Sequence, residues 1–294
     1  MASNDRRILF VHAHPDDETI ASGATMAKYV EAGAHVALVT CTLGEEGEVL
    51  VPSLEHMAAA HQDTLGGHRQ VELAEALKVL GVTDHEYLGG AGRYRDSGMM
   101  GLATNDRPNC FWQADLLEAA TPLVATIRRV RPQVVVTYNE FGQYGHPDHI
   151  QTHRVTSYAL GLAEAAPFKP ELGAAWSVAK VYWTALPKSA VERGIEAFIE
   201  AGGQGFFGLS QGEDLPWAVD DALLTAKVEA LEQEPRKMAA LRAHLSQVGE
   251  ENDFFRVSEL VGPEAMGIEY FQLARGVPGP RGADGLEDDL FAGL

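Results

Sequence analysis

Two short segments of the chain concentrate the side chains that bind metal ions and move protons. The first is His12-Ala13-His14-Pro15-Asp16-Asp17-Glu18, and the second is Gly142-Gln143-Tyr144-Gly145-His146-Pro147-Asp148-His149. Catalytic zinc takes three protein ligands from imidazoles and carboxylates and leaves a fourth position to water. The two cysteines, Cys41 and Cys110, form no Cys-x-x-Cys pair, so thiolates are not the expected ligands. The two segments therefore indicate a metal site held by His and carboxylate side chains.

Spacing within the two segments suggests which side chains would bind the metal. Pro15 ends an expected strand and begins a turn. In such a turn His14 and Asp17, three residues apart, can converge while Asp16 points elsewhere. His149 from the second segment would complete a set of three ligands.

The alternative reading of these side chains is structural. Asp16, Asp17 or Glu18 could cap the helix that is expected from Ile20. Two such segments that both follow a buried strand favour a site over a pair of turns. His12 lies inside the expected strand and is assigned to the core.

Short apolar runs and helical periodicities alternate along the first half of the chain. Expected strands cover Ile8–Val11, Val36–Thr40, Val82–Tyr87 and Val134–Tyr138, and expected helices cover Ile20–Ala32, His68–Leu80 and Leu116–Arg129. Strands that alternate with helices predict an α/β fold with a Rossmann-like, mostly parallel sheet flanked by helices. In such sheets ligands bind beyond the carboxyl ends of the strands, where both segments lie.

Composition divides the chain into three parts. Residues 1–166 are expected to form the Rossmann-like catalytic core that carries the metal site. Residues 167–275 are expected to form a smaller carboxy-terminal α/β region that completes the substrate pocket, with a strand over Ala179–Leu186 and a last helix from Pro235. Residues 276–294 are rich in Pro and Gly and end in acidic residues, which predicts a mobile tail.

Charge and hydropathy disfavour some classes of partner. The 294 residues include 23 Lys plus Arg and 42 Asp plus Glu, a net charge of −19, which is the wrong sign for neutralising nucleic-acid phosphates. Apolar runs are too short for a secretory signal or a bilayer span, so we expect a soluble, cytoplasmic protein with a small-molecule ligand. A dinucleotide-binding module is disfavoured because His-Pro-Asp-Asp occupies the turn that carries Gly-x-Gly-x-x-Gly in such modules. A non-catalytic sugar- or metal-binding protein stays open.

At both segments the sequence resembles the zinc-dependent N-acetylglucosaminyl deacetylases of the LmbE-like family. The family's marks are a His-Pro-Asp-Asp and a His-Pro-Asp-His segment, and both are intact, at residues 14–17 and 146–149. The similarity continues through residues 40–48, 88–99 and 239–247. In the middle segments the chain is more similar to the branch that deacetylates N-acetylglucosaminyl-inositol in mycothiol biosynthesis than to the mycothiol S-conjugate amidases, which stay the alternative. The resemblance implies a pseudodisaccharide substrate.

The resemblance also implies hydrolysis of an acetamide by metal-activated water, with one Zn²⁺ per chain or Fe²⁺ in its place. Asp16 would be the general base, because it neighbours a ligand yet is free of the metal. His146 would be a cationic partner that stabilises the oxyanion, with Asp148 holding its ring unless Asp148 is a helix cap. Tyr144, between two glycines, would offer its hydroxyl to the carbonyl oxygen or form only a lid contact.

Sugar recognition needs planar donors and carboxylates that pair with hydroxyl groups. By the resemblance, Arg69 and Asp96 would contact the glucosamine ring, and Glu48 and Met99 would lie nearer the inositol. The alternatives are that Arg69 is an exposed cation in the first turn of a helix and that Glu48 is a solvated loop charge.

Overall fold

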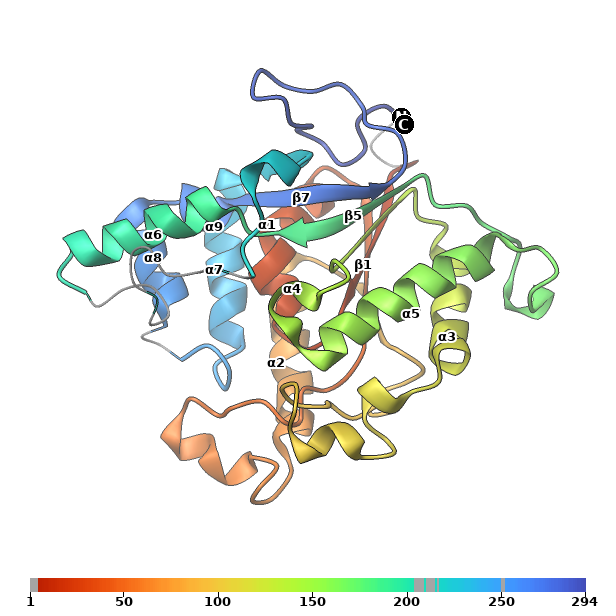
Figure 1. The fold of residues 1–294 in the computed structure, drawn as a ribbon, viewed down its shortest axis with the longest axis horizontal. Coiled ribbons are helices and arrows are strands. Elements are labelled where there is room, and N and C mark those ends of the chain that lie inside the picture. The colour runs from red at the N-terminus through yellow and green to blue at the C-terminus, as the bar shows by residue number, and fades with distance from the viewer. Residues whose placement is uncertain (1–4, 204–208, 210–214, 216, 250–251) are drawn as a thin grey trace.

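The computed structural model describes residues 5–203, 209, 215, 217–249 and 252–294. Residues 1–4 of the expected core lie outside this described part. So do residues 204–208, 210–214, 216 and 250–251 of the expected carboxy-terminal region. Within the described part, seven strands form a single open sheet with helices on both faces (Figure 1). The expected α/β class is confirmed.

The strands are β1 (Arg7–His12), β2 (His35–Thr40), β3 (Asp84–Tyr87), β4 (Val134–Thr137), β5 (Lys180–Ala185), β6 (Ala226–Glu229) and β7 (Ile268–Arg275). The α-helices are α1 (Asp17–Glu31), α2 (Leu65–Leu80), α3 (Leu116–Val130), α4 (Gly142–Gly145), α5 (Pro147–Glu164), α6 (Lys188–Glu200), α7 (Glu234–Ala243), α8 (Asp253–Val261) and α9 (Glu264–Gly267). Short 3₁₀ helices cover Pro52–Met57, Ala103–Asp106, Phe111–Gln113, Pro170–Leu172, Asp221–Leu223 and Leu231–Gln233.

The order of strands creates a crevice in the middle of the sheet. The order is β3-β2-β1-β4-β5-β7-β6, and β1 to β5 run parallel. The strands β2 and β3 lie on one side of β1, and the strands from β4 onward lie on its other side. Because the connections after β1 and β4 leave in opposite directions, a crevice opens at the carboxyl ends of these two strands.

Central strands bury side chains on both faces. In β1, Ile8 and Phe10 belong to a buried cluster with side chains of α1, α2 and α7, whereas Leu9 and Val11 belong to a second cluster with side chains of α3 and α5. All four side chains are fully buried. This burial explains why the strands read as continuous apolar runs rather than as alternating patterns.

Local signals set the ends of two expected helices. Gly81 follows α2 with φ 82°, a left-handed conformation that glycine adopts readily, and its N–H bonds to Leu77 O at 2.8 Å. Asp115 precedes α3, and its carboxylate accepts a hydrogen bond from Glu118 N at 2.9 Å. Both helices lie where the periodicity predicted them.

Two strands were not expected from the sequence. β7 runs antiparallel to β5, and β6 runs antiparallel to β7. The described part of the carboxy-terminal region therefore extends the central sheet instead of forming a sheet of its own. β6 has only four residues, and both strands pair with partners that are distant in sequence, so local patterns are weak signals for them.

The segment after β7 packs on the core, which differs from the mobile tail that its composition predicts. Leu290 and Phe291 are buried. Glu287 is also buried and accepts hydrogen bonds from Lys180 Nζ and Tyr182 Oη, each at 2.6 Å. Apolar and charged anchors thus hold a segment whose Pro and Gly content favours disorder.

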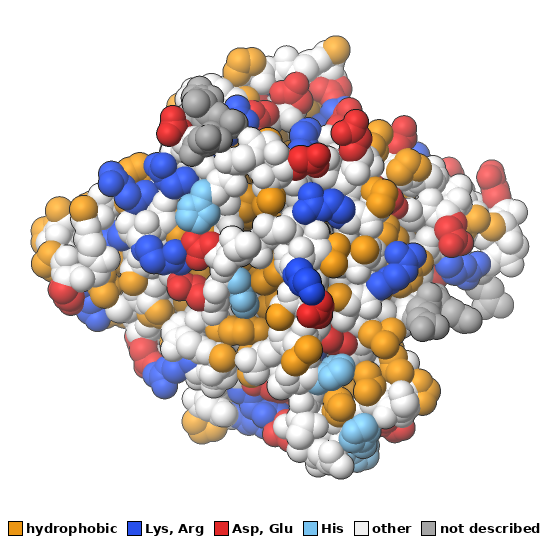
Figure 2. All heavy atoms as spheres, turned by 180° about the vertical axis from the view of Figure 1, so that it is seen from behind, with side chains coloured by type: hydrophobic (Ala, Val, Ile, Leu, Met, Phe, Trp, Pro, Cys, Tyr) orange, Lys and Arg blue, Asp and Glu red, His pale blue; other side chains and the backbone are white. Residues whose placement is uncertain are grey.

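The surface carries charges of both signs. On the face opposite to the view of Figure 1, Lys and Arg side chains are interspersed with Asp and Glu side chains (Figure 2). The acidic excess of the sequence is therefore not gathered into one patch on this face. Among the described residues, no helix combines the length and the apolar character needed to cross a bilayer.

Replacing Glu287 by Ala should destabilise the fold. The change leaves the Lys180 ammonium buried without its carboxylate, since the Lys180 and Glu287 side chains are only 1% and 0% exposed, and breaking such a pair costs about 3–5 kcal/mol. Chemical denaturation measures the loss. Asp284→Ala removes an exposed partner of Lys227 and should shift the midpoint far less; equal shifts would contradict a packed segment.

Candidate metal centre and active site

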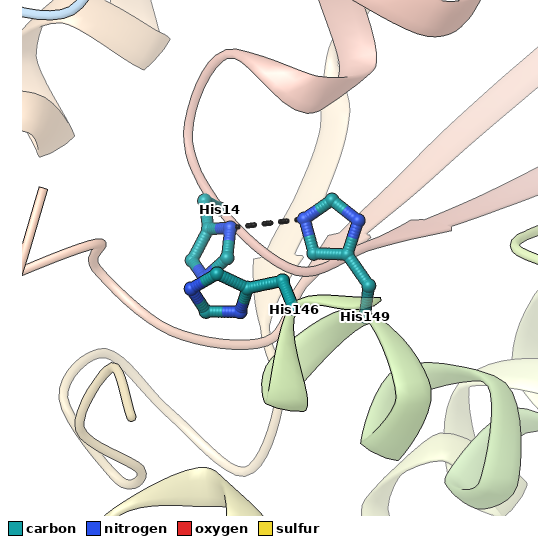
Figure 3. A group of neighbouring side chains, drawn as sticks. All are labelled: His14, His146 and His149. Atoms are coloured by element: carbon teal, nitrogen blue, oxygen red, sulfur yellow. Dashed lines mark hydrogen bonds between the residues drawn. The ribbon is translucent and has the colours of Figure 1, made fainter. Parts of the chain in front are cut away.

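The two ligand-rich segments meet at the crevice between β1 and β4. His14 lies in the turn after β1 and Asp17 begins α1, whereas His146 and His149 lie at the start of α5. Figure 3 shows the imidazoles of His14, His146 and His149 grouped together, although the two segments are far apart in the sequence. The predicted convergence of the segments is confirmed.

Three donor atoms form an equilateral triangle. His14 Nδ1 lies 3.3 Å from Asp17 Oδ2, His149 Nε2 lies 3.3 Å from the same oxygen, and the two nitrogens are 3.3 Å apart. Donors about 2.0–2.1 Å from a tetrahedral zinc ion are separated by about 3.3–3.4 Å. The spacing of the triangle therefore fits three ligands of one tetrahedral divalent cation.

A buried cluster of imidazoles and carboxylates surrounds the triangle. Asp96, His146 and Asp148 place donor atoms within 4.8 Å of one another and of His14. The two carboxylates face His14 Nε2, at 3.7 Å from Asp96 Oδ1 and 3.2 Å from Asp148 Oδ2. They therefore lie at the edge of the His14 ring opposite to Asp17. The cluster as a whole could bind a metal ion. The donors of His14, Asp17 and His149 are the ones that lie 3.3 Å from one another.

The carboxylate of Asp148 acts on His14, whereas the sequence predicted that it would hold His146. Asp148 Oδ2 accepts hydrogen bonds from His14 Nε2 at 3.2 Å and from Ser97 N at 3.0 Å, and Oδ1 accepts one from Ser97 Oγ. A proton held on Nε2 leaves the lone pair of His14 Nδ1 directed at the triangle. Asp148 thus selects the tautomer that can bind a metal.

His146 is oriented by the backbone of α5. Its side chain is the N-cap, and Nδ1 accepts a hydrogen bond from Asp148 N at 3.1 Å. Burial, together with the neighbouring charges of His14 and His149, lowers the pKa of His146 to about 3. A positive charge at a helix N-terminus is also unfavourable. Because Nδ1 accepts the hydrogen bond from Asp148 N, the proton of the neutral ring lies on Nε2.

Asp16 lies beside the triangle without joining it. Its carboxylate pairs with Arg69 Nη2 at 3.0 Å rather than capping α1. Burial raises the pKa of Asp16 to about 6, although the charge of Arg69 opposes this. A carboxylate that is free of the triangle and titrates near neutral pH is suited to accept a proton.

A sharp loop brings Tyr144 over the triangle. Gly142 has φ 63°, and a Cβ at this position would lie 2.7 Å from Ile150 N, so only glycine fits there. The Tyr144 hydroxyl lies 3.4 Å from His149 Nε2. The side chain is 48% exposed, so it combines contact with the triangle and access to solvent.

Arg69 lies inside the framework of the site, in contrast to the alternative of an exposed cation in the first turn of a helix. It is 2% exposed. Its guanidinium donates to Gly44 O at 2.8 Å, to Pro15 O and to Asp16 Oδ2 at 3.0 Å. These contacts tie Arg69 to the turn that contains Asp16, whereas its buried Nε has no hydrogen-bond partner among the described residues.

The other predicted sugar contacts lie on two loops beside the triangle. Asp96 is buried, and its Oδ1 lies 3.8 Å from His146 Nε2. Glu48 is exposed, and Met99 is 48% exposed. Arg95 joins the two loops because it donates to Glu46 Oε1 at 2.8 Å.

Tyr138 is a site residue that sequence reasoning took only for the end of a strand. Its ring stacks on that of His149 with centroids 4.2 Å apart. Its hydroxyl accepts a hydrogen bond from Ala13 N at 3.0 Å and lies 3.1 Å from His12 Nδ1. Tyr138 thus joins the two segments, and His12 is buried in the core as expected.

Fold and site together define a class of protein. The family model "PIG-L: GlcNAc-PI de-N-acetylase" matches residues 9–160, which is more than half of the chain. The chain belongs to this PIG-L (LmbE-like) family.

Relatives are similar over nearly the whole chain. A protein of Geodermatophilus obscurus is 57% identical over 290 residues, with 98% of both chains covered. A protein of Salinispora arenicola is 54% identical, with 99% of this chain and 92% of the relative covered. Both relatives are named 1D-myo-inositol 2-acetamido-2-deoxy-alpha-D-glucopyranoside deacetylase.

Solved structures share the fold at low sequence identity. N,N'-diacetylchitobiose deacetylase from Pyrococcus horikoshii is 19% identical with a TM-score of 0.60, covering 93% of this chain and 84% of that chain. The 4-carboxy-2-hydroxymuconate hydratase of Pseudomonas putida is 19% identical with a TM-score of 0.62, covering 95% and 100%. Because a deacetylase and a hydratase share the fold, the fold alone does not select the reaction.

Replacing His149 by Ala should abolish tight binding of a divalent metal, because it removes one corner of the triangle. Elemental analysis after dialysis measures the metal content per chain. The matched control is His153→Ala, one turn further along α5, whose ring donates to Tyr138 O at 3.0 Å; it should retain the metal. A full complement of metal in His149→Ala would rule out the triangle as the binding site.

Proposed function

We propose that this chain is a hydrolase that removes acetate from 1D-myo-inositol 2-acetamido-2-deoxy-α-D-glucopyranoside, a step of mycothiol biosynthesis. Support comes from relatives that carry this name at 51–57% identity over nearly the full length of the chain. The observation that carries the proposal is the triangle of three metal-type donors. The carboxylate of Asp16 lies beside this triangle and is not part of it.

We propose that His14, Asp17 and His149 hold one Zn²⁺, with Fe²⁺ as the alternative metal. The 3.3 Å spacing of their donor atoms supports this assignment. Bound metal would supply Lewis acidity, which polarises the acetyl carbonyl and acidifies the attacking water.

The chain's own residues would then move the protons. Asp16 accepts the proton of the attacking water, a role supported by its raised pKa of about 6. The proton is returned to the sugar nitrogen as its bond to the acetyl carbon breaks, so that acetate and the free amine are the products. His146 donates a hydrogen bond from Nε2 to the acetyl oxygen as negative charge develops there, which a neutral ring with Nδ1 already bonded can do. The Tyr144 hydroxyl is the second donor on this side of the site.

The sugar would lie above the triangle between the two loops. We assign Arg69 and Asp96 to the glucosamine ring, and Glu48 and Met99 to the inositol side. The carboxy-terminal region would complete this pocket, a role supported by the hydrogen bond from Leu50 N to Ser246 O at 3.0 Å. A reducing, cytoplasmic location fits the two free thiols of the chain.

The purified chain should release acetate from the acetamido pseudodisaccharide, and a chelator should abolish the activity until zinc is restored. Quantifying acetate over time measures the reaction. The rival reading is a mycothiol S-conjugate amidase, so both substrates are assayed side by side. A higher kcat/KM on the S-conjugate would replace the proposed function with that of the amidase.

Asp16→Asn should lower kcat by about 10²- to 10⁴-fold, the usual contribution of a general base. The amide keeps the size of the side chain but cannot accept the proton. Metal content should stay at the parental level, because Asp16 lies outside the triangle. Parental turnover in Asp16→Asn would exclude it as the base, and a non-catalytic binding protein would show no turnover in the parent either.

A further inference from the structure

The peptide bond between Pro15 and Asp16 is held from both sides. Its carbonyl oxygen, Pro15 O, accepts a hydrogen bond from Arg69 Nη2. Its N–H, on Asp16, donates to Glu18 Oε2 at 2.9 Å. With both polar groups of the peptide engaged, the unit cannot rotate without breaking a buried hydrogen bond.

These two hydrogen bonds hold Asp16 in a backbone conformation that is otherwise unfavourable. Asp16 has φ 123° and ψ −35°, outside the regions open to a residue with a side chain. Such a conformation costs on the order of 1–3 kcal/mol and persists only where the surroundings enforce it. The position of the Asp16 carboxylate therefore depends on the groups that bind its peptide.

Glu18 is itself held by a residue from the far end of the chain. Glu18 Oε1 accepts hydrogen bonds from His244 Nε2 at 2.9 Å and from Thr19 Oγ1 at 2.5 Å. The side chains of Glu18 and His244 are both 0% exposed. A buried carboxylate of this kind is kept in place by its partners, because rotation would leave it without them.

His244 is rigidly placed by a turn that follows α7. Its N–H donates to Leu241 O at 3.1 Å, and its carbonyl accepts from Gln247 N at 3.0 Å and Val248 N at 2.8 Å. It also lies beyond residues 9–160, the part of the chain that the family model matches. A segment outside the matched region thus reaches the turn that carries Asp16.

We propose that Glu18 and His244 are positioning residues that hold the Pro15–Asp16 peptide and so fix the carboxylate of Asp16 for catalysis. The inference rests on the proposed function, in which Asp16 accepts a proton. Releasing Glu18 lets the peptide rotate, so that the carboxylate leaves its place. The metal triangle persists, because Asp17 Oδ2 keeps its own hydrogen bond from His14 N at 2.8 Å.

The test compares two substitutions of His244 that differ only in reach. In His244→Gln the side-chain amide extends as far as the imidazole Nε2 and can still donate to Glu18, whereas the amide of His244→Asn is too short. His244→Asn should lower kcat by about 10- to 100-fold, as for other groups that orient reactive residues. KM and metal content should stay within about twofold of the parent. His244→Gln should recover most of the lost kcat.

Glu18→Gln supplies an independent variant, since one amide oxygen cannot replace two carboxylate oxygens that accept three hydrogen bonds. It too should lower kcat with its metal retained. The structural control is Arg236→Ala on α7, which removes hydrogen bonds to Val79 O and Leu80 O but does not touch the turn. It should lower the melting temperature without lowering kcat.

Parental kcat in His244→Asn would overturn the inference. So would equal losses in His244→Asn and His244→Gln, or a loss that follows metal content or melting temperature, since these outcomes indicate a purely structural role. Acetate release by the parent protein is measured in the same experiment. A parent that releases no acetate refutes the proposed function, whereas an active parent with an unaffected His244→Asn refutes only the positioning role.

Discussion

The constraint on which the structure depends is that three donor atoms from two distant segments lie 3.3 Å from one another in a buried place. Such a group is unfavourable by itself, because lone pairs and a carboxylate are crowded together and removed from water. The doubly wound sheet provides the place, since β1 and β4 end side by side where the chain changes direction across the sheet. Hydrogen bonds at the outer edges compensate part of the buried charge, and the metal ion proposed for the centre would compensate the rest.

The start of α5 shows how closely the parts depend on one another. His146 caps the helix by accepting a hydrogen bond at Nδ1, while the carboxylate of Asp148 accepts one from His14 and His149 completes the triangle. One helical turn thus supplies three different functions, because its side chains leave in different directions. The hydratase that shares this fold shows that the sheet supports more than one chemistry. In the proposed function, the choice of reaction is therefore assigned to these side chains and to the loops beside them.

Much of the site could be predicted because the signals are local. His-Pro-Asp-Asp and His-Pro-Asp-His each follow an apolar run, so both the donors and their place at the strand ends were readable from the sequence. The orientation of each ring was not readable. The carboxylate of Asp148 was expected to act on His146 and accepts a hydrogen bond from His14, and the contact of Arg69 with Asp16 was not foreseen. These partners are distant in sequence, so no local pattern encodes which nitrogen or oxygen they meet.

The sequence by itself determined the parallel core, because buried strands and amphipathic helices leave periodic patterns that depend only on neighbouring residues. It also determined which side chains would gather at the crevice. Only the tertiary structure decided that β6 and β7 extend the same sheet, that Leu290 and Phe291 are buried, and that His244 meets Glu18. Pairings of this kind are chosen by burial and hydrogen-bond satisfaction over the whole fold, which a linear pattern does not contain.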